Sequence, residues 1–470
     1  MVQLLVSIVL CFMSNPAAAD WMADQAAHSR SYLLKNISPS GTAPGAVVAS
    51  PSRSNPDYFY HWVRDAALVM NAVVSLYENE TDAARKNEYE ETLTNFIRFS
   101  AMNQTTANRS DKLSSGRLGE PKFLVNGADF AGDWGRPQND GPALRAITLI
   151  RLANLWLDAG RKQDVVPTLY SPELPALSPI KRDLEFVAYN WEKTSFDIWE
   201  EISGQHFYTR LVHHRALREG AKLAQRLGDT NAASFYEEQL SYVSGSRRRT
   251  DLPAGFPNLG TLVASHWQQG LLVPTFDRDG GIDYKYRNID TAVLLAVLHA
   301  RGEDGFYAAS DSRVLATLER QIAEFQALYP VNHKGYGATV LGRYPEDTYN
   351  GLESGKEGNP WFLTTAAVAE IHFRAAREIE AAHSFAADAH NEMFLQAVGV
   401  KPLAVYQGQD KDELVRKIRL RGDAFLARAC FHGLADGHLS EQINRHTGFM
   451  QGAPDLTWSY ASFLTAYWQR

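Results

Sequence analysis

Apolar residues recur at helical spacing along almost the entire chain. Hydrophobic positions three and four residues apart form one face of a helix, whereas strict alternation is typical of a strand. Alternating patterns are few and short here. The spacing predicts about a dozen helices in an all-α protein: an N-terminal one over residues 21–34, then 66–77, 89–102, 142–159, 179–192, 208–227, 232–243, 290–299, 313–328, 362–380, 385–397, 411–432 and 456–468.

The connections between these helices alternate in length. The long ones are rich in Gly, Pro, Asp and aromatic residues and cover residues 38–61, 105–140, 247–288, 329–360 and 433–455. Ordered loops of this length are uncommon unless they carry function. Long loops after every second helix indicate a toroid of paired inner and outer helices, with the long loops gathered on one face.

Composition narrows the class of protein. The 470 residues are 45% hydrophobic and 21% charged, as in a soluble globular protein. The net charge of −7 disfavours nucleic acid or an anionic membrane as a partner. No linker or low-complexity tract interrupts the chain, which predicts one domain over residues 20–470.

The N-terminus resembles a secretory signal. Residues 4–13 are apolar and are followed by the small residues Ala17, Ala18 and Ala19. The pattern predicts cleavage after Ala19, and the apolar stretch is too short for a comfortable membrane span. We therefore expect an exported protein, secreted or periplasmic, whose mature chain keeps one cysteine, Cys430.

Two acidic tracts suggest the chemistry. Glu200 and Glu201 follow Trp199 directly, and Glu441 lies far away among polar loop residues. A carboxyl group that loses hydration beside an aromatic ring is kept protonated, which suits a general acid. A separate carboxyl group that stays ionised suits a general base, so the two tracts together indicate hydrolysis of a glycosidic bond.

Other long loops mix aromatic and charged residues in the same way. Arg64 and Asp65 follow Tyr58 and Trp62 and come directly before a predicted helix. Asp65 is suited to capping that helix, and the Arg64–Asp65 pair is equally suited to binding sugar hydroxyls. Similar mixtures occur at residues 134–142 and 343–349, and Trp361 follows a Gly-Asn-Pro sequence.

Taken together, these segments resemble the glucoamylases of glycoside hydrolase family 15. The matching tracts are residues 58–65, 134–145, 197–204, 343–349 with 358–361, and 440–442 with 455–460, and they span essentially the whole mature chain. The resemblance implies an (α/α)6 barrel. It also implies a glucan 1,4-alpha-glucosidase that releases β-D-glucose, with inversion, from the non-reducing ends of α-1,4-glucans, and acts more slowly on α-1,6 links.

The resemblance also assigns roles to residues. It implies that Glu200 is the general acid and Glu441 the general base, with carboxyl groups roughly 6.5–9.5 Å apart as inversion requires. It implies that the protein needs neither a cofactor nor a metal and that it is a monomer. The partner that it implies is a glucan substrate: starch, maltooligosaccharides or glycogen-type glucan. The implied substrate-binding residues are Tyr58, Trp62, Arg64, Asp65, Trp134, Trp199, Glu201, Arg343, Asp347 and Trp361.

Some features depart from the family pattern, and two alternatives stay open. Residues 351–357 lengthen a loop that shapes the outer subsites, and no starch-binding module is expected after residue 470. One alternative is a related inverting hydrolase of glucodextranase or trehalase type, which a substrate panel would distinguish. The other is a non-catalytic carbohydrate-binding protein, which the presence of both Glu200 and Glu441 disfavours.

Overall fold

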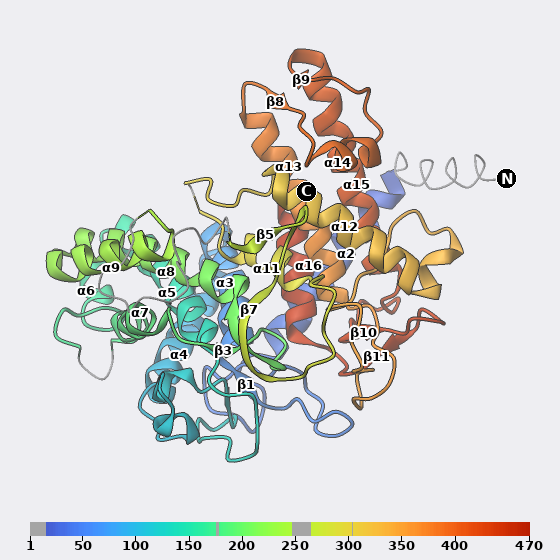
Figure 1. The fold of residues 1–470 in the computed structure, drawn as a ribbon. Coiled ribbons are helices and arrows are strands. Elements are labelled where there is room, and N and C mark those ends of the chain that lie inside the picture. Colours follow the sequence, from blue (N-terminus) through green and yellow to red (C-terminus); the bar gives the residue numbers. More distant parts are fainter. Residues whose placement is uncertain (1–15, 175–177, 247–264, 303) are drawn as a thin grey trace.

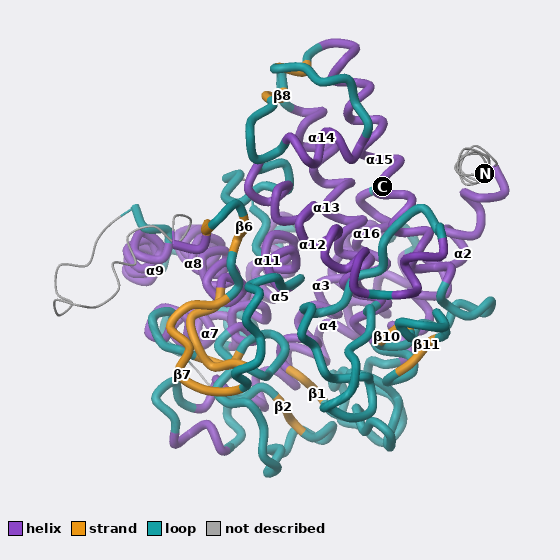
Figure 2. Tube along the Cα trace, turned by 45° about the vertical axis from the view of Figure 1, so that its right-hand side comes forward, coloured by secondary structure: helices purple, strands orange, loops and turns teal. Residues whose placement is uncertain are grey.

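The predicted all-α architecture is confirmed. The computed structural model describes residues 16–174, 178–246, 265–302 and 304–470, and within them helices dominate and strands are short (Figures 1 and 2). The first fifteen residues lie outside the described part, so the signal sequence stays a prediction. In the described part, no helix combines the length and the apolar character needed to cross a bilayer.

An inner ring of helices forms the centre of the molecule. Each of its helices packs against the next and the last packs against the first, so the ring is closed. Its buried faces are rich in Ala, Val and Leu, which lets neighbouring helices approach closely. Within the described residues the ring consists of α3 (Val63–Asn79), α5 (Asp140–Asp158), α8 (Phe207–Leu227), α11 (Ala292–His299), α13 (Phe362–Ala381) and α16 (Thr457–Gln469).

A second layer of helices surrounds the ring. Each outer helix packs mainly against one inner helix. Three outer helices begin with an aspartate that caps the first turn, at Asp82, Asp229 and Asp311. This pairing completes an (α/α)6 barrel. The outer helices α4 (Ala83–Asn103), α7 (Pro179–Asn190), α9 (Thr230–Val243), α12 (Ser312–Leu328), α15 (Gly408–Phe431) and α2 (Pro16–Lys35) cover α3, α5, α8, α11, α13 and α16 in that order.

Short elements occupy the connections. A three-stranded antiparallel sheet joins β3 (Ser195–Phe196), β4 (Ile202–His206) and β7 (Thr275–Gly281) in the order β3-β4-β7. The other strands form two-residue antiparallel pairs: β1 (His61–Trp62) with β2 (Lys122–Phe123), β5 (Trp267–Gln268) with β6 (Leu271–Leu272), β8 (Phe385–Ala386) with β9 (Val405–Tyr406), and β10 (Gln442–Ile443) with β11 (Met450–Gln451). Short helices are α6 (Lys162–Val165), α14 (Glu392–Val398), η1 (Arg109–Lys112), η2 (Arg117–Gly119) and η3 (Pro330–Lys334).

One predicted helix, over residues 385–397, is wrong in its first half. Phe385 and Ala386 form β8, and α14 begins only at Glu392. The reason is a turn between them, in which the side chain of Asp388 accepts hydrogen bonds from the backbone N–H groups of His390 and Asn391. Side-chain bonding of this kind competes with helix formation. The predicted long loop over residues 247–288 lies partly outside the described residues.

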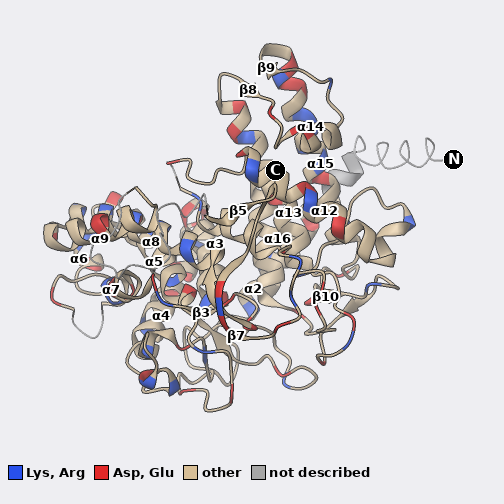
Figure 3. Ribbon diagram, viewed as in Figure 1, with Lys and Arg blue, Asp and Glu red and all other residues tan. Residues whose placement is uncertain are grey.

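The two ends of the barrel differ. The inner helices all begin at the end where the long loops gather, and their later turns line a hollow at the opposite end. That hollow is rich in arginines paired with carboxylates, such as Arg374 with Glu370 and Arg215 with Glu219. Over the surface, Lys and Arg are interspersed with Asp and Glu (Figure 3). The beginnings of the helices therefore share one end, where their partial positive charges meet.

Candidate active site

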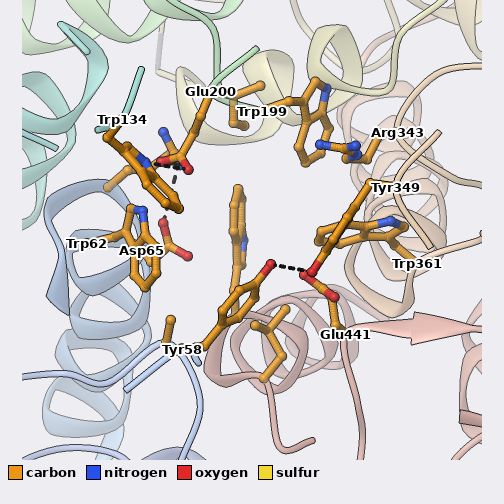
Figure 4. A pocket seen from close by; sticks show the side chains of 15 residues that line it. Tyr58, Trp62, Asp65, Trp134, Trp199, Glu200, Arg343, Tyr349, Trp361 and Glu441 are labelled. Atoms are coloured by element: carbon orange, nitrogen blue, oxygen red, sulfur yellow. Dashed lines mark hydrogen bonds and ion pairs between the residues drawn. The ribbon is translucent and has the colours of Figure 1, made fainter. Parts of the chain in front are cut away.

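A pocket lies where the inner helices begin. Including its open mouth, it encloses about 560 Å³. Aromatic rings form most of its wall, and charged groups project between them (Figure 4). Its lining residues are Ala49, Tyr58, Trp62, Arg64, Asp65, Trp134, Ile198, Trp199, Glu200, Arg343, Tyr349, Trp361, Glu441, Leu456 and Trp458.

Glu200 is held on a tight turn between β3 and β4. Its backbone N–H donates to the carbonyl oxygen of Asp197 at 2.9 Å, and the Asp197 carboxylate accepts from the N–H of Glu201 at 2.8 Å. Glu200 has φ +69°, a left-handed conformation that is unfavourable for a residue with a side chain. Strain of this kind persists where the surroundings enforce it, and it is concentrated at functional sites.

Three donors fix the carboxyl group of Glu200. Trp134 Nε1 donates to Oε2 at 2.8 Å, while Gln138 Nε2 and Arg64 NH2 approach Oε1 at 3.1 Å and 3.3 Å. Trp199 also borders the pocket, but its indole N–H donates to Asp290 at 2.8 Å. The prediction that Trp199 is the aromatic partner of the acid is therefore wrong, because the left-handed turn points Glu200 toward Trp134.

A buried ion network supports the turn from beneath. Lys285 is 1% exposed, pairs with Asp290 and lies 3.6 Å from Asp197. Its positive charge helps to hold the pKa of Asp197 below the usual value, against the effect of burial. Asp290, which comes just before α11, also accepts a hydrogen bond from Trp199. The network therefore connects two residues of the turn, Asp197 and Trp199, to the start of α11.

Arg64 and Asp65 lie in the first turn of α3. Of the two roles left open for Asp65, helix capping is excluded, since the N-cap is Trp62 and Asp65 is the third helical residue. Its Oδ2 makes no hydrogen bond within the described residues and lies 3.4 Å from Arg64 Nε. Burial raises the pKa of Asp65 to about 6, although Arg64 opposes the increase. A buried oxygen at the pocket wall that makes no hydrogen bond is suited to a ligand hydroxyl.

Glu441 faces the pocket from the side opposite Glu200 (Figure 4). The sequence predicts a carboxylate in a polar loop that ionises readily, but this is wrong: Glu441 is 1% exposed, and burial raises its pKa to about 8. A hydrogen bond from Tyr58 and the charge of Arg343 oppose that increase. Tyr58 in turn shares a hydrogen bond of 2.9 Å with Tyr349. Gly452, at φ +75°, leaves room for the carboxyl group, because a side chain there would collide with it.

Arg343 borders the pocket, and two carboxylates, those of Asp347 and Glu201, hold its guanidinium group. Asp347 accepts from Nε and NH2 at 2.8 Å and 2.6 Å, and Glu201 accepts from NH2 at 2.9 Å. The hydroxyl of Tyr344 donates to the other oxygen of Glu201 at 2.5 Å. Burial raises the pKa of Glu201, and Arg343 lowers it. Glu201 and Asp347 therefore lie behind Arg343 and do not border the pocket.

The structure brings together ten of the predicted site residues at one pocket. Only Glu201 and Asp347 of that set lie outside its wall. Sequence reasoning missed several supporting residues, namely Gln138, Lys285, Asp290 and Tyr344. Gln138 and Tyr344 lie inside tracts of mixed aromatic and charged composition, whereas nothing in the sequence marks Lys285 or Asp290 as part of a site. Among the described residues, no group of three or more His, Cys, Asp or Glu could hold a metal ion.

The pocket and the barrel together define a class of protein. A glycoside hydrolase needs one carboxyl group on each side of its substrate, and this aromatic-lined hollow has them, together with a positive Arg64 and an Asp65 oxygen that makes no hydrogen bond. Aromatic faces suit the C–H faces of sugar rings, and the charged groups suit their hydroxyls.

Comparison with known proteins identifies the family. The family model "Glycosyl hydrolases family 15" matches residues 27–468, so the chain belongs to this family. It is 39% identical to a glucoamylase of Blastobotrys adeninivorans over 94% of this chain and 70% of that protein. It is 32% identical to an intracellular, sporulation-specific glucoamylase of Saccharomyces cerevisiae over 96% of this chain and 84% of that protein. The glucoamylase structure from Hypocrea jecorina matches with a TM-score of 0.83 and 31% identity, covering 96% of this chain and 72% of that one.

Proposed function

We propose that this protein is an inverting, exo-acting glucoamylase in which Glu200 is the general acid and Glu441 the general base. The observation that carries the proposal is the placement of the two carboxyl groups on opposite sides of one pocket (Figure 4). The family supports the same reaction, since relatives that are 39% and 34% identical to this chain are glucoamylases. The substrate is starch, maltooligosaccharides or glycogen-type glucan.

The geometry suggests a role for each group in the reaction. Glu200 gives its proton to the glycosidic oxygen as the bond from that oxygen to the anomeric carbon breaks. The donors Trp134, Gln138 and Arg64 then stabilise the negative charge left on Glu200. Glu441 takes a proton from the water that attacks the anomeric carbon from the opposite face, which inverts the configuration.

The shape of the pocket supports attack at chain ends. Trp458 and Leu456 line it and are 5% and 3% exposed, so buried side chains form part of its lining. A terminal glucose fits against such a surface, whereas the middle of a glucan chain needs an open cleft. The closed ring of inner helices carries the whole pocket, which supports residues 20–470 as a single catalytic domain.

The product tests the reaction directly. With maltotriose, we expect glucose as the released sugar, with β-glucose seen first by proton NMR before mutarotation. Isomaltooligosaccharides should react more slowly, and trehalose should not react at matched enzyme concentration. Initial α-glucose would contradict inversion, and a preference for dextran-type substrates or trehalose would favour the related hydrolases.

Two substitutions test the assigned residues. Glu200→Gln and Glu441→Gln should each lower kcat by about 10²–10⁴-fold, because an amide keeps the shape but can neither donate nor accept the required proton. The control is Glu91→Gln on the exposed face of α4, which should leave kcat unchanged. Circular dichroism establishes that the variants are folded. If either variant keeps more than about a tenth of the wild-type kcat, the role of that residue is wrong.

A further inference from the structure

Lys122 occupies an unusual position behind the aromatic wall of the pocket. It lies on β2, opposite Trp62 on β1, and is 3% exposed. Its ammonium lies 4.1 Å from the ring centre of Tyr60 and 4.3 Å from that of Trp62. The distances to the ring centres of Phe130 and Trp134 are 4.1 Å and 3.7 Å. We call these four rings the aromatic cage.

The cage replaces the partners that a buried charge normally has. No hydrogen bond or ion pair reaches the Lys122 ammonium from any residue that the structure describes. Burying an unpaired ammonium is costly, and the faces of the four rings supply compensating negative potential in direct contact, while the carboxylates of Glu200 and Asp57 act on the charge from farther away. Each ring therefore keeps a face toward Nζ, and the charge restricts the orientation of all four. The rings also meet edge to face, for example Trp62 with Trp134.

One ring of the cage contacts the general acid. Trp134 presents its face to Lys122 and its Nε1–H to Glu200 Oε2, at 2.8 Å. Trp134 is 36% exposed, so its outer side is not held by packing. A loop indole that is open to solvent needs an anchor if its N–H is to keep one direction. The ammonium beneath it is that anchor.

We propose that Lys122 is a positioning residue, which acts through the aromatic cage to keep the Trp134 N–H directed at Glu200 during proton transfer. The proposal rests on the proposed function, because it matters only if Glu200 is the acid. The hydrogen bond strengthens as negative charge develops on Glu200, so its loss should lower kcat more than it raises KM. No bond is made or broken at Lys122 itself.

The direct test is Lys122→Met, which keeps the length of the side chain and removes its charge. We expect kcat on maltotriose to fall about 10- to 100-fold, the effect of a misplacement near 1 Å, with a smaller change in KM. Lys122→Arg, which keeps the charge, should recover most of kcat. The matched control is Lys86→Met, because Lys86 is half-buried and also lies over a ring, that of Tyr77 at 5.1 Å, but on α4 and outside the pocket.

A double-mutant cycle with Trp134→Phe tests the route of the effect. Phenylalanine keeps a ring in the cage but lacks the N–H, so Lys122→Met should lower kcat little further in that background. Additive losses would overturn the proposal, as would a Lys122→Met variant with wild-type kcat or with a change in KM alone. If Lys122→Met does not fold, Phe130→Leu opens the cage without removing the charge and should still lower kcat. These outcomes can be distinguished from failure of the proposed function. If Glu200 were not the general acid, Glu200→Gln would itself remain active.

Discussion

Glu200 and Glu201 are neighbours in sequence, yet at the residue scale their carboxyl groups point in different directions and bind different partners. The carboxyl group of Glu200 is bound by Trp134, Gln138 and Arg64, whereas that of Glu201 is bound by Arg343 and Tyr344. The left-handed conformation of Glu200 produces the divergence. Sequence patterns identify the acidic pair but not the directions, because the choice of φ depends on contacts with distant residues.

The base depends on its neighbouring tyrosine for its ionisation, which leads to a prediction for pH dependence. The Tyr58 hydrogen bond lowers the pKa of Glu441, so Tyr58→Phe should raise that pKa further. Glu441 would then stay protonated to higher pH, and the acid limb of kcat/KM would move to higher pH. Tyr349→Phe is the comparison, since it removes only the outer hydroxyl of the pair and should give a smaller shift. A Tyr58→Phe profile whose acid limb stays in place or moves to lower pH would contradict this account.

How much of the site is visible in the sequence differs between residues. Tyr58, Arg64, Arg343 and Trp361 lie in tracts whose composition is unusual, and all four border the pocket. Lys122 lies in no such tract. Its importance comes from four rings contributed by residues 60–134, and side-chain geometry of that kind does not follow from spacing.

At the scale of elements, apolar spacing predicts the inner helices closely. The segment over residues 385–397, outside the inner ring, is predicted less well. The helical spacing of apolar residues predicts a helix over residues 290–299, and α11 begins within two residues of the predicted start. The helix over residues 385–397 shares that periodicity, but the Asp388 turn prevents its first half from forming. Periodicity therefore identifies a helix reliably where no side chain competes for the backbone.

A buried ion pair joins α5 to α7 and yields a prediction for stability. Arg145 donates to both oxygens of Asp183, at 2.8 Å and 2.7 Å, and the two side chains are 3% and 0% exposed. Asp183→Asn leaves the buried guanidinium without its charge partner and should lower the free energy of unfolding by about 3–5 kcal/mol. The measurement is urea unfolding, with kcat of the folded fraction expected to be unchanged.

Two further variants separate this pair from ordinary surface pairs. Asp158→Asn breaks the exposed pair between Asp158 and Arg226, and its effect on stability should be much smaller. Replacing both buried partners, Arg145→Met with Asp183→Leu, should recover most of the loss because no charge is left unpaired. Equal effects of the buried and exposed Asp→Asn substitutions would contradict the prediction.

For the whole molecule, the closed ring makes the last helix indispensable. α16 packs against α13, α3 and α2, and it buries Trp458, Phe463 and Leu464. Burial of large apolar side chains contributes about 1.5–3 kcal/mol each, so these three alone approach the net stability of a typical domain, about 5–15 kcal/mol. A chain ending at residue 456 should therefore not fold, as judged by circular dichroism and gel filtration.

The control for that truncation lacks only Arg470, whose ion pair with Asp423 is partly exposed. It should unfold at the wild-type temperature. A cooperative transition in the chain that ends at residue 456 would mean that the other five inner helices hold together without closure of the ring.

Trp458 borders the pocket on one side and the hollow at the opposite end of the barrel on the other. Its indole therefore closes the barrel axis, and a glucose unit released beside it has to depart by the mouth through which the glucan entered. The shortened glucan must withdraw first, so the enzyme releases the polymer after each cleavage. Under the proposed reaction, successive cleavages therefore fall on different glucan chains, and in a mixture of long and short glucans all chains lose glucose units at the same time.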